Sequence, residues 1–201
     1  MIAAAATPET YGRDAALATF SVSRYQRMIE AGILTPDDKV ELLENYVVRK
    51  MPRNPPHGST IQRMLRPLLK MLPAAWDLRI QSAILLDDSQ PEPDFALVRG
   101  TAADYEQRHP VPAEIGVVIE VADASLLRDQ RDKTRIYARA NIACYWIVNL
   151  VDGRIEVFAQ PTGAVALPSY QSFQMFQVGD LVPLVLDGQA AGALAAADML
   201  P

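Results

Sequence analysis

Cysteine, histidine and long apolar runs are scarce in this sequence, and each scarcity excludes a class of protein. Cys144 is the one cysteine, so the chain forms no intramolecular disulfide and no cysteine-rich metal site. His57 and His109 are the two histidines, too few for a multi-histidine zinc site. No apolar run approaches the roughly 20 residues that cross a bilayer. We therefore expect a cytoplasmic protein with no membrane partner.

The first residues lack the features of a signal peptide. Met1–Thr19 is rich in alanine, but acidic and aromatic residues interrupt it and no basic segment precedes it. We expect residues 1–19 to form a flexible extension, residues 20–188 a single domain and residues 189–201 an alanine-rich C-terminal segment. Within that segment, Ala190–Leu200 is expected to be helical and to cover a partner subunit, which favours a homodimer.

Acidic residues are absent between Asn45 and Trp76, although the whole chain has a formal net charge of −5. The net charge argues mildly against a nucleic-acid partner, because phosphate binding requires Lys and Arg. Basic residues gather in the acid-free stretch, and Arg53, Arg63 and Arg66 are the candidates for contacts with nucleic acid. Charge alone favours the simpler interpretation, a solvated helix face.

Hydrophobic periodicity predicts one α/β domain, with a mixed central sheet and helices packed on it. A helix over Val22–Ala31 should end at Gly32, and a hairpin should turn at Glu44-Asn45. A helix over His57–Leu72 carries Pro67, where we expect a kink or an interruption. The other expected elements are strands at Lys39–Leu43, Tyr46–Met51, Asp77–Leu86, Asp94–Val98, Ile115–Ala122, Ala143–Leu150 and Arg154–Ala159, short strands between Val165 and Leu186, and a helix at Leu126–Ala140.

Three charged residues stand where apolar residues are expected. Glu120 interrupts the almost continuously apolar strand Ile115–Ala122, and Asp94 begins the short strand that follows a Pro-Glu-Pro segment. Lys133 falls on the inward stripe of the next helix, where lysine is rare unless a carboxylate lies inside. Asp129, one helical turn earlier, shares that face.

Side-chain chemistry alone leaves two interpretations of these residues open. In the first, Asp94, Glu120 and Lys133 form a structural ion cluster, although buried clusters seldom stabilise a fold more than apolar side chains do. In the second, the two carboxylates bind Mg²⁺, which takes one or two carboxylates plus waters. The lysine would then orient the attacking water or offset charge in a phosphoryl-transfer transition state.

Several segments, in order along the chain, resemble a known family. They are Val40-Glu-Leu-Leu-Glu-Asn-Tyr-Val-Val48, Met51-Pro-Arg-Asn-Pro-Pro-His57, Pro91-Glu-Pro-Asp-Phe-Ala-Leu-Val98, Val118-Ile-Glu-Val-Ala122 and Ile142-Ala-Cys-Tyr-Trp-Ile-Val148, with Asp129, Lys133 and Tyr137 between the last two. The set resembles the Uma-two family of proposed restriction endonucleases, in the PD-(D/E)XK nuclease superfamily, over roughly Phe20 to Phe158. The resemblance implies a restriction-endonuclease-like core, preceded by an N-terminal helix and a β-hairpin.

The resemblance also implies roles for individual residues. Asp94 matches the aspartate of the PD motif and Glu120 the acid of the (D/E)XK motif, which makes both metal ligands. Alanine stands at position 122, where the motif has lysine, and Lys133 on the next helix is the implied replacement. The implied activity is hydrolysis of DNA phosphodiester bonds with Mg²⁺, or with Mn²⁺ in its place.

Further polar residues match the family pattern with less definite roles. Glu41 on the hairpin is a candidate catalytic residue, whereas His57, Gln81 and Asp129 are candidate supporting residues that structural roles would also explain. Tyr137 is expected to belong to the core. Two other functions stay open: a non-catalytic module on a nuclease scaffold that binds nucleic acid or protein, and a metal-dependent hydrolase of small phosphoesters.

Overall fold

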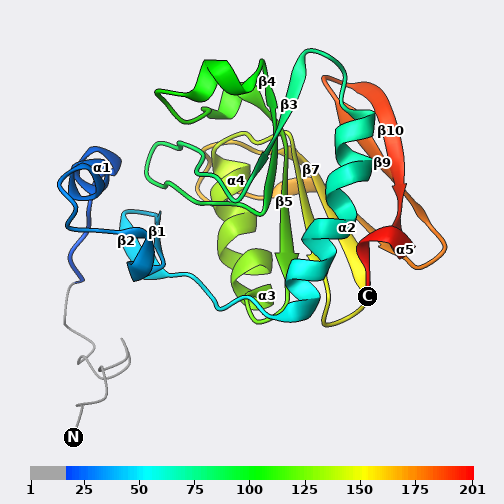
Figure 1. The fold of residues 1–201 in the computed structure, drawn as a ribbon, viewed down its shortest axis with the longest axis horizontal. Coiled ribbons are helices and arrows are strands. Elements are labelled where there is room, and N and C mark those ends of the chain that lie inside the picture. Colours follow the sequence, from blue (N-terminus) through cyan, green and yellow to red (C-terminus); the bar gives the residue numbers. More distant parts are fainter. Residues whose placement is uncertain (1–16) are drawn as a thin grey trace, which may run out of the picture.

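A six-stranded sheet forms the centre of the protein in a computed structural model that describes residues 17–201. The strand order is β3-β4-β5-β6-β7-β8, with β5 and β6 parallel and all other neighbours antiparallel (Figure 1). The expected mixed α/β fold is confirmed, while the extension expected before residue 17 lies outside the described residues. The strands are β3 (Trp76–Ile80), β4 (Phe95–Arg99), β5 (Ile115–Ala122), β6 (Cys144–Asn149), β7 (Arg154–Pro161) and β8 (Tyr170–Gln177).

Helices cover both faces of this sheet (Figure 1). One face packs against α2, the β9-β10 hairpin and α5, and the other against the helical segment that joins β5 to β6. No helix within residues 17–201 has the length and apolar character needed to cross a membrane. These elements and those that remain are α1 (Val22–Glu30), η2 (Pro36–Asp38), β1 (Val40–Leu43), β2 (Tyr46–Arg49), α2 (Pro55–Met71), η3 (Ala102–Tyr105), η4 (Pro112–Glu114), α3 (Leu126–Arg128), the π-helical turn η5 (Asp129–Lys133), α4 (Thr134–Arg139), β9 (Leu181–Leu186), β10 (Gln189–Ala195) and α5 (Ala196–Met199).

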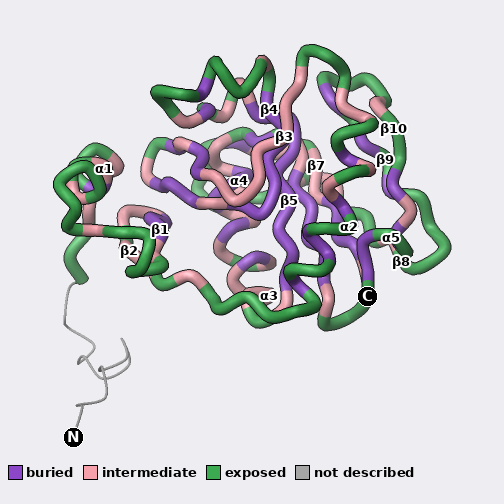
Figure 2. Tube along the Cα trace, in the orientation of Figure 1, coloured by how far each residue is buried: buried purple, intermediate pink, exposed green. Residues whose placement is uncertain are grey.

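The central strand β5 separates two hydrophobic cores. Val117, Ile119 and Val121 pack on the side of α2, whereas Val118 and Ala122 pack on the side of α4. Figure 2 shows that β5 is buried along its length, as expected of a central strand covered on both faces. Because side chains alternate along a strand, the single carboxylate of β5 points to the α4 side.

The hairpin β1-β2 is fastened to α4 through its turn. Glu44 and Asn45 have φ angles of 49° and 66°, the left-handed conformation that a tight two-residue turn requires. The carboxylate of Glu44 forms ion pairs with Arg135 and, at 2.8 Å, with Arg139. The hairpin is thereby fixed against the helix that carries Lys133.

Two expectations about regular structure need correction. The strand expected at Asp77–Leu86 ends at Ile80, because Gln81 takes a φ of 49° and leaves the extended conformation. The helix α2 continues through Pro67, so the interruption expected there as the alternative to a kink is absent. Its apolar stripe is anchored in the core on both sides of the proline, and this packing outweighs the hydrogen bond that proline cannot donate.

The C-terminal segment also differs from expectation. Most of Ala190–Leu200 is the strand β10, which pairs antiparallel with β9, and only a short helix follows it. Leu194, Met199 and Leu200 are buried in the core of the same chain. The expectation of a helix over this segment is therefore wrong, and these buried side chains are not offered to a partner subunit.

Two glycines give opposite predictions for the stability of this fold. A Cβ atom at Gly116 in β5 would lie 2.7 Å from Leu186 Cδ2 and from the ring of Trp76, whereas one at Gly58 in α2 would meet nothing within 4 Å. We expect Gly116→Ala to lower the free energy of unfolding by about 1–3 kcal/mol through overpacking. Gly58→Ala should raise it by up to about 1 kcal/mol, because alanine loses less entropy in a helix. Urea denaturation checks both values, and an unchanged midpoint for Gly116→Ala would contradict the close packing described here.

Candidate functional site

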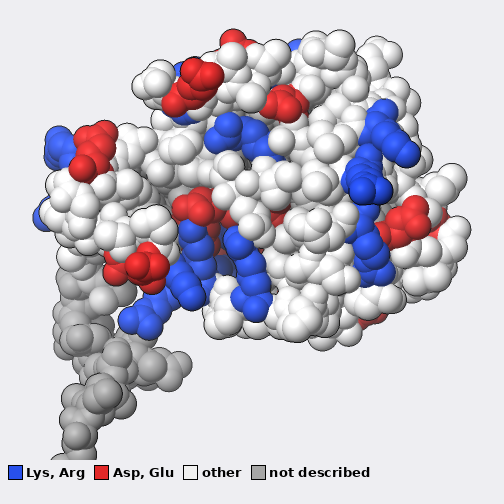
Figure 3. All heavy atoms as spheres, viewed as in Figure 1, with Lys and Arg blue, Asp and Glu red and all other residues white. Residues whose placement is uncertain are grey.

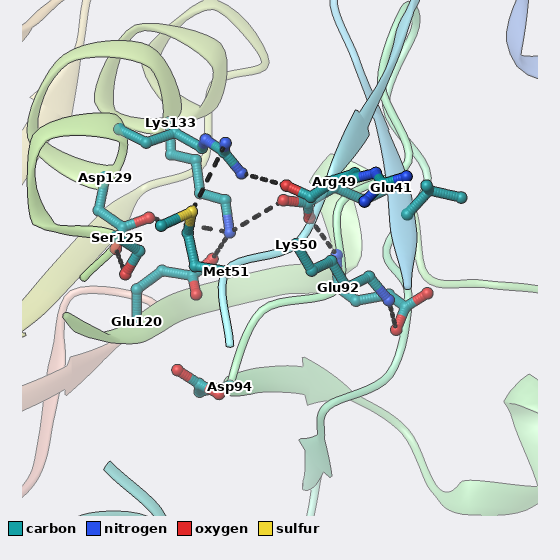
Figure 4. Close-up of polar contacts among 12 residues, drawn as sticks. Glu41, Arg49, Lys50, Met51, Glu92, Asp94, Glu120, Ser125, Asp129 and Lys133 are labelled. Atoms are coloured by element: carbon teal, nitrogen blue, oxygen red, sulfur yellow. Dashed lines mark hydrogen bonds and ion pairs between the residues drawn. The ribbon is translucent and has the colours of Figure 1, made fainter. Parts of the chain in front are cut away.

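Five buried charged side chains from separate segments meet on the α4 side of the sheet (Figure 4). The hairpin supplies Glu41, β5 supplies Glu120, and η5 supplies Asp129 and Lys133, while Asp94 is the residue directly before β4. None of these side chains is more than 7% exposed. All five line one cavity of about 60 Å³.

Strand register brings Asp94 next to Glu120. Phe95 at the start of β4 pairs with Ile119 of β5, so the antiparallel register places Asp94 opposite Glu120 one position further along. Residues opposite each other in antiparallel strands have Cβ atoms about 4.5–5.5 Å apart. The two carboxylates therefore belong to one site.

Asp94 is held from three directions. Its Oδ2 accepts a hydrogen bond from the backbone N–H of Val121 at 2.9 Å and lies 3.1 Å from Nε2 of His57. Its Oδ1 accepts a weaker bond from Nε2 of Gln81 at 3.3 Å. Burial alone raises the pKa of Asp94, but the interactions with His57 and the Val121 N–H outweigh it and hold the pKa below its usual value. This carboxylate is ionised at neutral pH.

The ammonium group of Lys133 lies among three carboxylates. Its Nζ is 2.8 Å from Oε1 of Glu120, 3.7 Å from Glu41 and 3.9 Å from Asp129. Oε1 of Glu120 also accepts a hydrogen bond from the hydroxyl of Tyr137 at 2.9 Å. No hydrogen bond to the other oxygen of Glu120 is seen within residues 17–201, so Oε2 is available to a ligand.

Burial changes where the protons of this cluster reside. Desolvation raises the pKa of Glu120 to about 8 and that of Asp129 to about 6, although Lys133 lowers both. Desolvation lowers the pKa of Lys133, but the surrounding carboxylates outweigh it and raise that pKa above its usual value. Lys133 therefore keeps its charge, and Glu120 tends to hold a proton at neutral pH when no other cation is near.

The π-helical turn η5 aims Asp129 and Lys133 into the cavity together. The helix expected at Leu126–Ala140 is present as α3, η5 and α4, and its backbone widens over η5. The carbonyl of Asp129 accepts hydrogen bonds from Thr134 Oγ1 at 2.9 Å and from the hydroxyl of Tyr145 at 3.3 Å. Such turns are rare and frequently accompany functional sites.

Sequence reasoning missed the group that ties this turn to the sheet. Glu156 in β7 is 2% exposed and accepts hydrogen bonds on both oxygens from Gln130 of η5, at 2.9 and 3.0 Å. Asn149 and Arg154 donate to the same carboxylate at 2.9 and 2.8 Å. A glutamate between the apolar residues of β7 was the available signal, of the same kind as Glu120 in β5. Tyr137, expected only as core, also contacts the site through its hydroxyl.

The other residues singled out in the sequence divide into two groups. Glu41 lies inside the site, where its Oε2 accepts a hydrogen bond from the backbone N–H of Glu92 at 3.3 Å. Arg53 is exposed at the cavity mouth and donates to Gln81 at 2.8 Å. Arg63 and Arg66 are exposed on α2 and do not line the cavity.

The donor set of the cavity fits a hydrated hard cation. Within residues 17–201, no three Asp, Glu, His or Cys side chains are arranged to hold a metal ion together. Mg²⁺ does not require three, because it keeps several waters and uses one or two carboxylates. Asp94 and Glu120 supply two, and a cavity of about 60 Å³ exceeds the 10–15 Å³ or so that one water needs.

The buried lysine gives a prediction for stability. Lys133→Met should lower the free energy of unfolding by about 3–5 kcal/mol at pH 8, because it leaves Glu120 and its neighbours without their cation. The folded pKa values of Asp129 and Glu120 then rise further above their unfolded values of about 3.9 and 4.3. Below about pH 6 these acids hold their protons in both folded proteins, so the loss should be smallest there. It should grow as the pH rises from about 6 to about 9, through the wild-type folded pKa values of Asp129, about 6, and Glu120, about 8, because only the wild type then releases these protons.

Chemical denaturation of both proteins across this pH range is the measurement. Lys70→Met is the matched control, since Lys70 is exposed on α2, and it should change stability by less than about 0.5 kcal/mol. Equal stability of Lys133→Met and the wild type at pH 8 would show that the ammonium does not balance these acids.

Comparisons with known proteins identify the fold and the family of the chain. A crystal structure described as a "putative nuclease belonging to DUF820" from Anabaena variabilis superposes with a TM-score of 0.68 at 11% sequence identity, over 90% of this chain and 97% of that one. At this identity the likeness shows a shared fold. No curated protein matches the chain. The model of the Uma2 family, described as "Putative restriction endonuclease", matches residues 22–191. The resemblance noted in the sequence is thereby confirmed, and the chain belongs to the Uma2 family of nuclease-like proteins.

Proposed function

We propose that this protein is a Mg²⁺-dependent endonuclease that hydrolyses phosphodiester bonds in DNA. The observation that carries the proposal is the cavity in which Asp94 and Glu120 lie side by side, with the ammonium of Lys133 2.8 Å from Glu120. Membership of a family described as restriction endonucleases supports the same activity. Mn²⁺ is the expected substitute, since it shares the preference of Mg²⁺ for oxygen ligands.

In this proposal Asp94 and Glu120 hold the divalent cation. When bound, the cation supplies Lewis acidity, which polarises the scissile phosphate and lowers the pKa of an attacking water. His57, Gln81 and the N–H of Val121 keep the Asp94 carboxylate ionised and oriented. This fixed geometry matters because misplacement of a ligand or reactant by about 1 Å can cost 10²-fold in rate.

Lys133 and Glu41 act from the other side of the cavity. The ammonium of Lys133 offsets the negative charge that develops on the phosphate oxygens, and it can orient the attacking water. Glu41, 3.7 Å from that ammonium, is placed to accept a hydrogen bond from the same water. Tyr137 holds Glu120 through its hydroxyl and so leaves one oxygen of Glu120 facing the cavity.

The distribution of unpaired cations supports DNA as the substrate. Figure 3 shows Lys and Arg side chains beside a small acidic area and in a second group beside α2. Arg53, Arg63, Arg66 and Arg128 form no ion pair within the part of the chain that the structure describes. Arg53 and Arg128 line the candidate site, and Arg63 and Arg66 are exposed on α2. A protein with a net charge of −5 thus keeps unpaired cations that phosphates could contact.

A supercoiled plasmid and short DNA strands, incubated with Mg²⁺, Mn²⁺ or EDTA, test this activity. The wild type should cut with either metal and not in EDTA. Asp94→Asn, Glu120→Gln and Lys133→Met should each lower the rate by at least about 10²-fold, the order seen when one charge-stabilising group is removed. Glu106→Gln, which alters an exposed carboxylate outside the cavity, is the control and should cut at the wild-type rate.

Two outcomes would favour the other functions. A wild type that binds DNA but never cuts it would indicate a binding module on a nuclease scaffold. A wild type that hydrolyses only small phosphoesters would indicate a phosphoesterase, for which the acidic net charge is less of an obstacle.

We further propose that the protein acts as a cytoplasmic homodimer, because cleavage of both strands of a duplex uses two active sites. The edge strand β8 supports this, since Phe173 and Met175 on it are 49% and 56% exposed. Light scattering during gel filtration should give twice the chain mass, and Met175→Lys should shift it towards the monomer. A monomer mass for the wild type at high concentration would contradict the dimer.

A further inference from the structure

A second and larger cavity adjoins the candidate active site. Its volume is about 720 Å³, and it lies between α1, the β1-β2 hairpin and the segment that leads to α2. It meets the cavity of the candidate site at that segment, because the two have several lining residues in common. The shared residues are Lys50, Met51, Pro52, Arg53 and Glu92.

The walls of this second cavity combine apolar surface with positive charge. Ile29 and Leu34 line it from the side of α1, and Val40 from the hairpin. Lys39 and Arg53 also line it, and neither forms an ion pair within residues 17–201. Its other cation and its one carboxylate, Lys50 and Glu92, pair with each other. The cavity therefore carries net positive charge in an acidic protein.

The frame around the cavity is fixed by hydrogen bonds. The hydroxyl of Tyr25 in α1 donates to the carbonyl of Val40 at 3.4 Å, and Gln26 donates to Gln90 at 3.1 Å. The backbone N–H of Gln90 in turn donates to the backbone carbonyl of Leu42 in the hairpin at 2.8 Å. Helix, hairpin and the loop before β4 thus form one support, so the cavity is present before any ligand arrives.

We propose that this cavity binds one unpaired nucleotide of the DNA strand, directly beside the phosphate that is cut. The inference rests on the proposed nuclease function and adds the class of substrate. A base has two apolar faces that Ile29 and Leu34 can cover. The phosphate of the same nucleotide is negatively charged and can pair with Lys39 and Arg53, which form no other ion pair among the described residues. A volume of about 720 Å³ falls within the usual range of small-ligand sites, roughly 300–1,000 Å³.

An unpaired nucleotide fits this cavity better than a paired one. A base inside a duplex reaches a side cavity only after it leaves the stack, which costs a few kcal/mol unless it is already unpaired. The preferred substrates are therefore single-stranded DNA and duplexes with an unpaired nucleotide next to the cleavage point. A perfect duplex is bound less tightly.

Binding of fluorescent DNA in EDTA, where no cleavage occurs, tests the proposal. The probes are a single strand, a perfect duplex, and the same duplex with one bulged nucleotide. The wild type should bind the first and third at least about fivefold more tightly than the second, because extraction of a paired base costs a few kcal/mol. Ile29→Gln, a change at an exposed helix position, should abolish this preference.

The charged wall is tested separately through the salt dependence. Lys39→Ala should weaken binding of the single strand and reduce its salt slope by roughly 0.7, the value for one phosphate contact. Lys70→Ala, an exposed lysine on α2 that does not line either cavity, is the matched control and should keep the wild-type preference among the probes. Equal binding of all three probes, or a preference that survives both Ile29→Gln and Lys39→Ala, would overturn the proposal.

Failure of this inference is distinguishable from failure of the nuclease function. If metal-dependent cleavage depends on Glu120 but Ile29→Gln and Lys39→Ala bind DNA as the wild type does, the nucleotide-binding proposal is wrong and the nuclease proposal stands. If DNA binding depends on these two residues but no metal supports cleavage, the nucleotide-binding proposal stands and the nuclease proposal is wrong.

Discussion

The ammonium of Lys133, buried among carboxylates, is the interaction on which the candidate site depends. It lies 2.8 Å from Glu120, 3.7 Å from Glu41 and 3.9 Å from Asp129, and so joins β5, the hairpin and η5 at one point. Burial raises the pKa of Glu120 to about 8, because desolvation and the neighbouring acids together outweigh the lowering by this single ammonium. The site is therefore short of positive charge, and a divalent cation beside Asp94 would supply it.

The rest of the fold keeps that lysine in place. The π-helical turn η5 faces the sheet with Lys133, and Gln130 in the same turn is held by the buried carboxylate of Glu156. On the opposite side, Glu44 binds the hairpin to α4 through Arg135 and Arg139, which places Glu41 over the cavity. Burial of the ion cluster is costly, so these second contacts are needed to hold it in a single geometry.

The sequence predicted those site residues that are charged at positions where the hydrophobic pattern calls for an apolar side chain. Glu120 was conspicuous because β5 is otherwise apolar, and Lys133 because its helical phase points inward. Asp94 was singled out at the start of its strand, and the family resemblance added its role as the aspartate of the PD motif. His57 and Gln81 were predicted as supporting residues, and both contact Asp94.

Other features of the fold depend on contacts between distant segments, and the local sequence pattern does not predict them. The widened helix at η5 is held by hydrogen bonds that involve Tyr145 and Glu156, which lie on later strands of the sheet. The alanine-rich stretch after residue 189 has high helical propensity, yet its pairing with β9 and burial of Leu194 make it a strand. Tertiary contacts overrode local propensity in both cases.

Calorimetric titration of the metal-free protein with Mg²⁺, repeated with Asp94→Asn, tests the central claim most directly. Asparagine keeps the shape of Asp94 and removes its charge, while Lys133 and Glu120 are left unchanged. The account predicts that the wild type binds Mg²⁺ and that Asp94→Asn loses this binding while remaining folded. A wild type that takes up no Mg²⁺, or a variant that binds it equally well, would contradict the account and leave the buried cluster a structural feature.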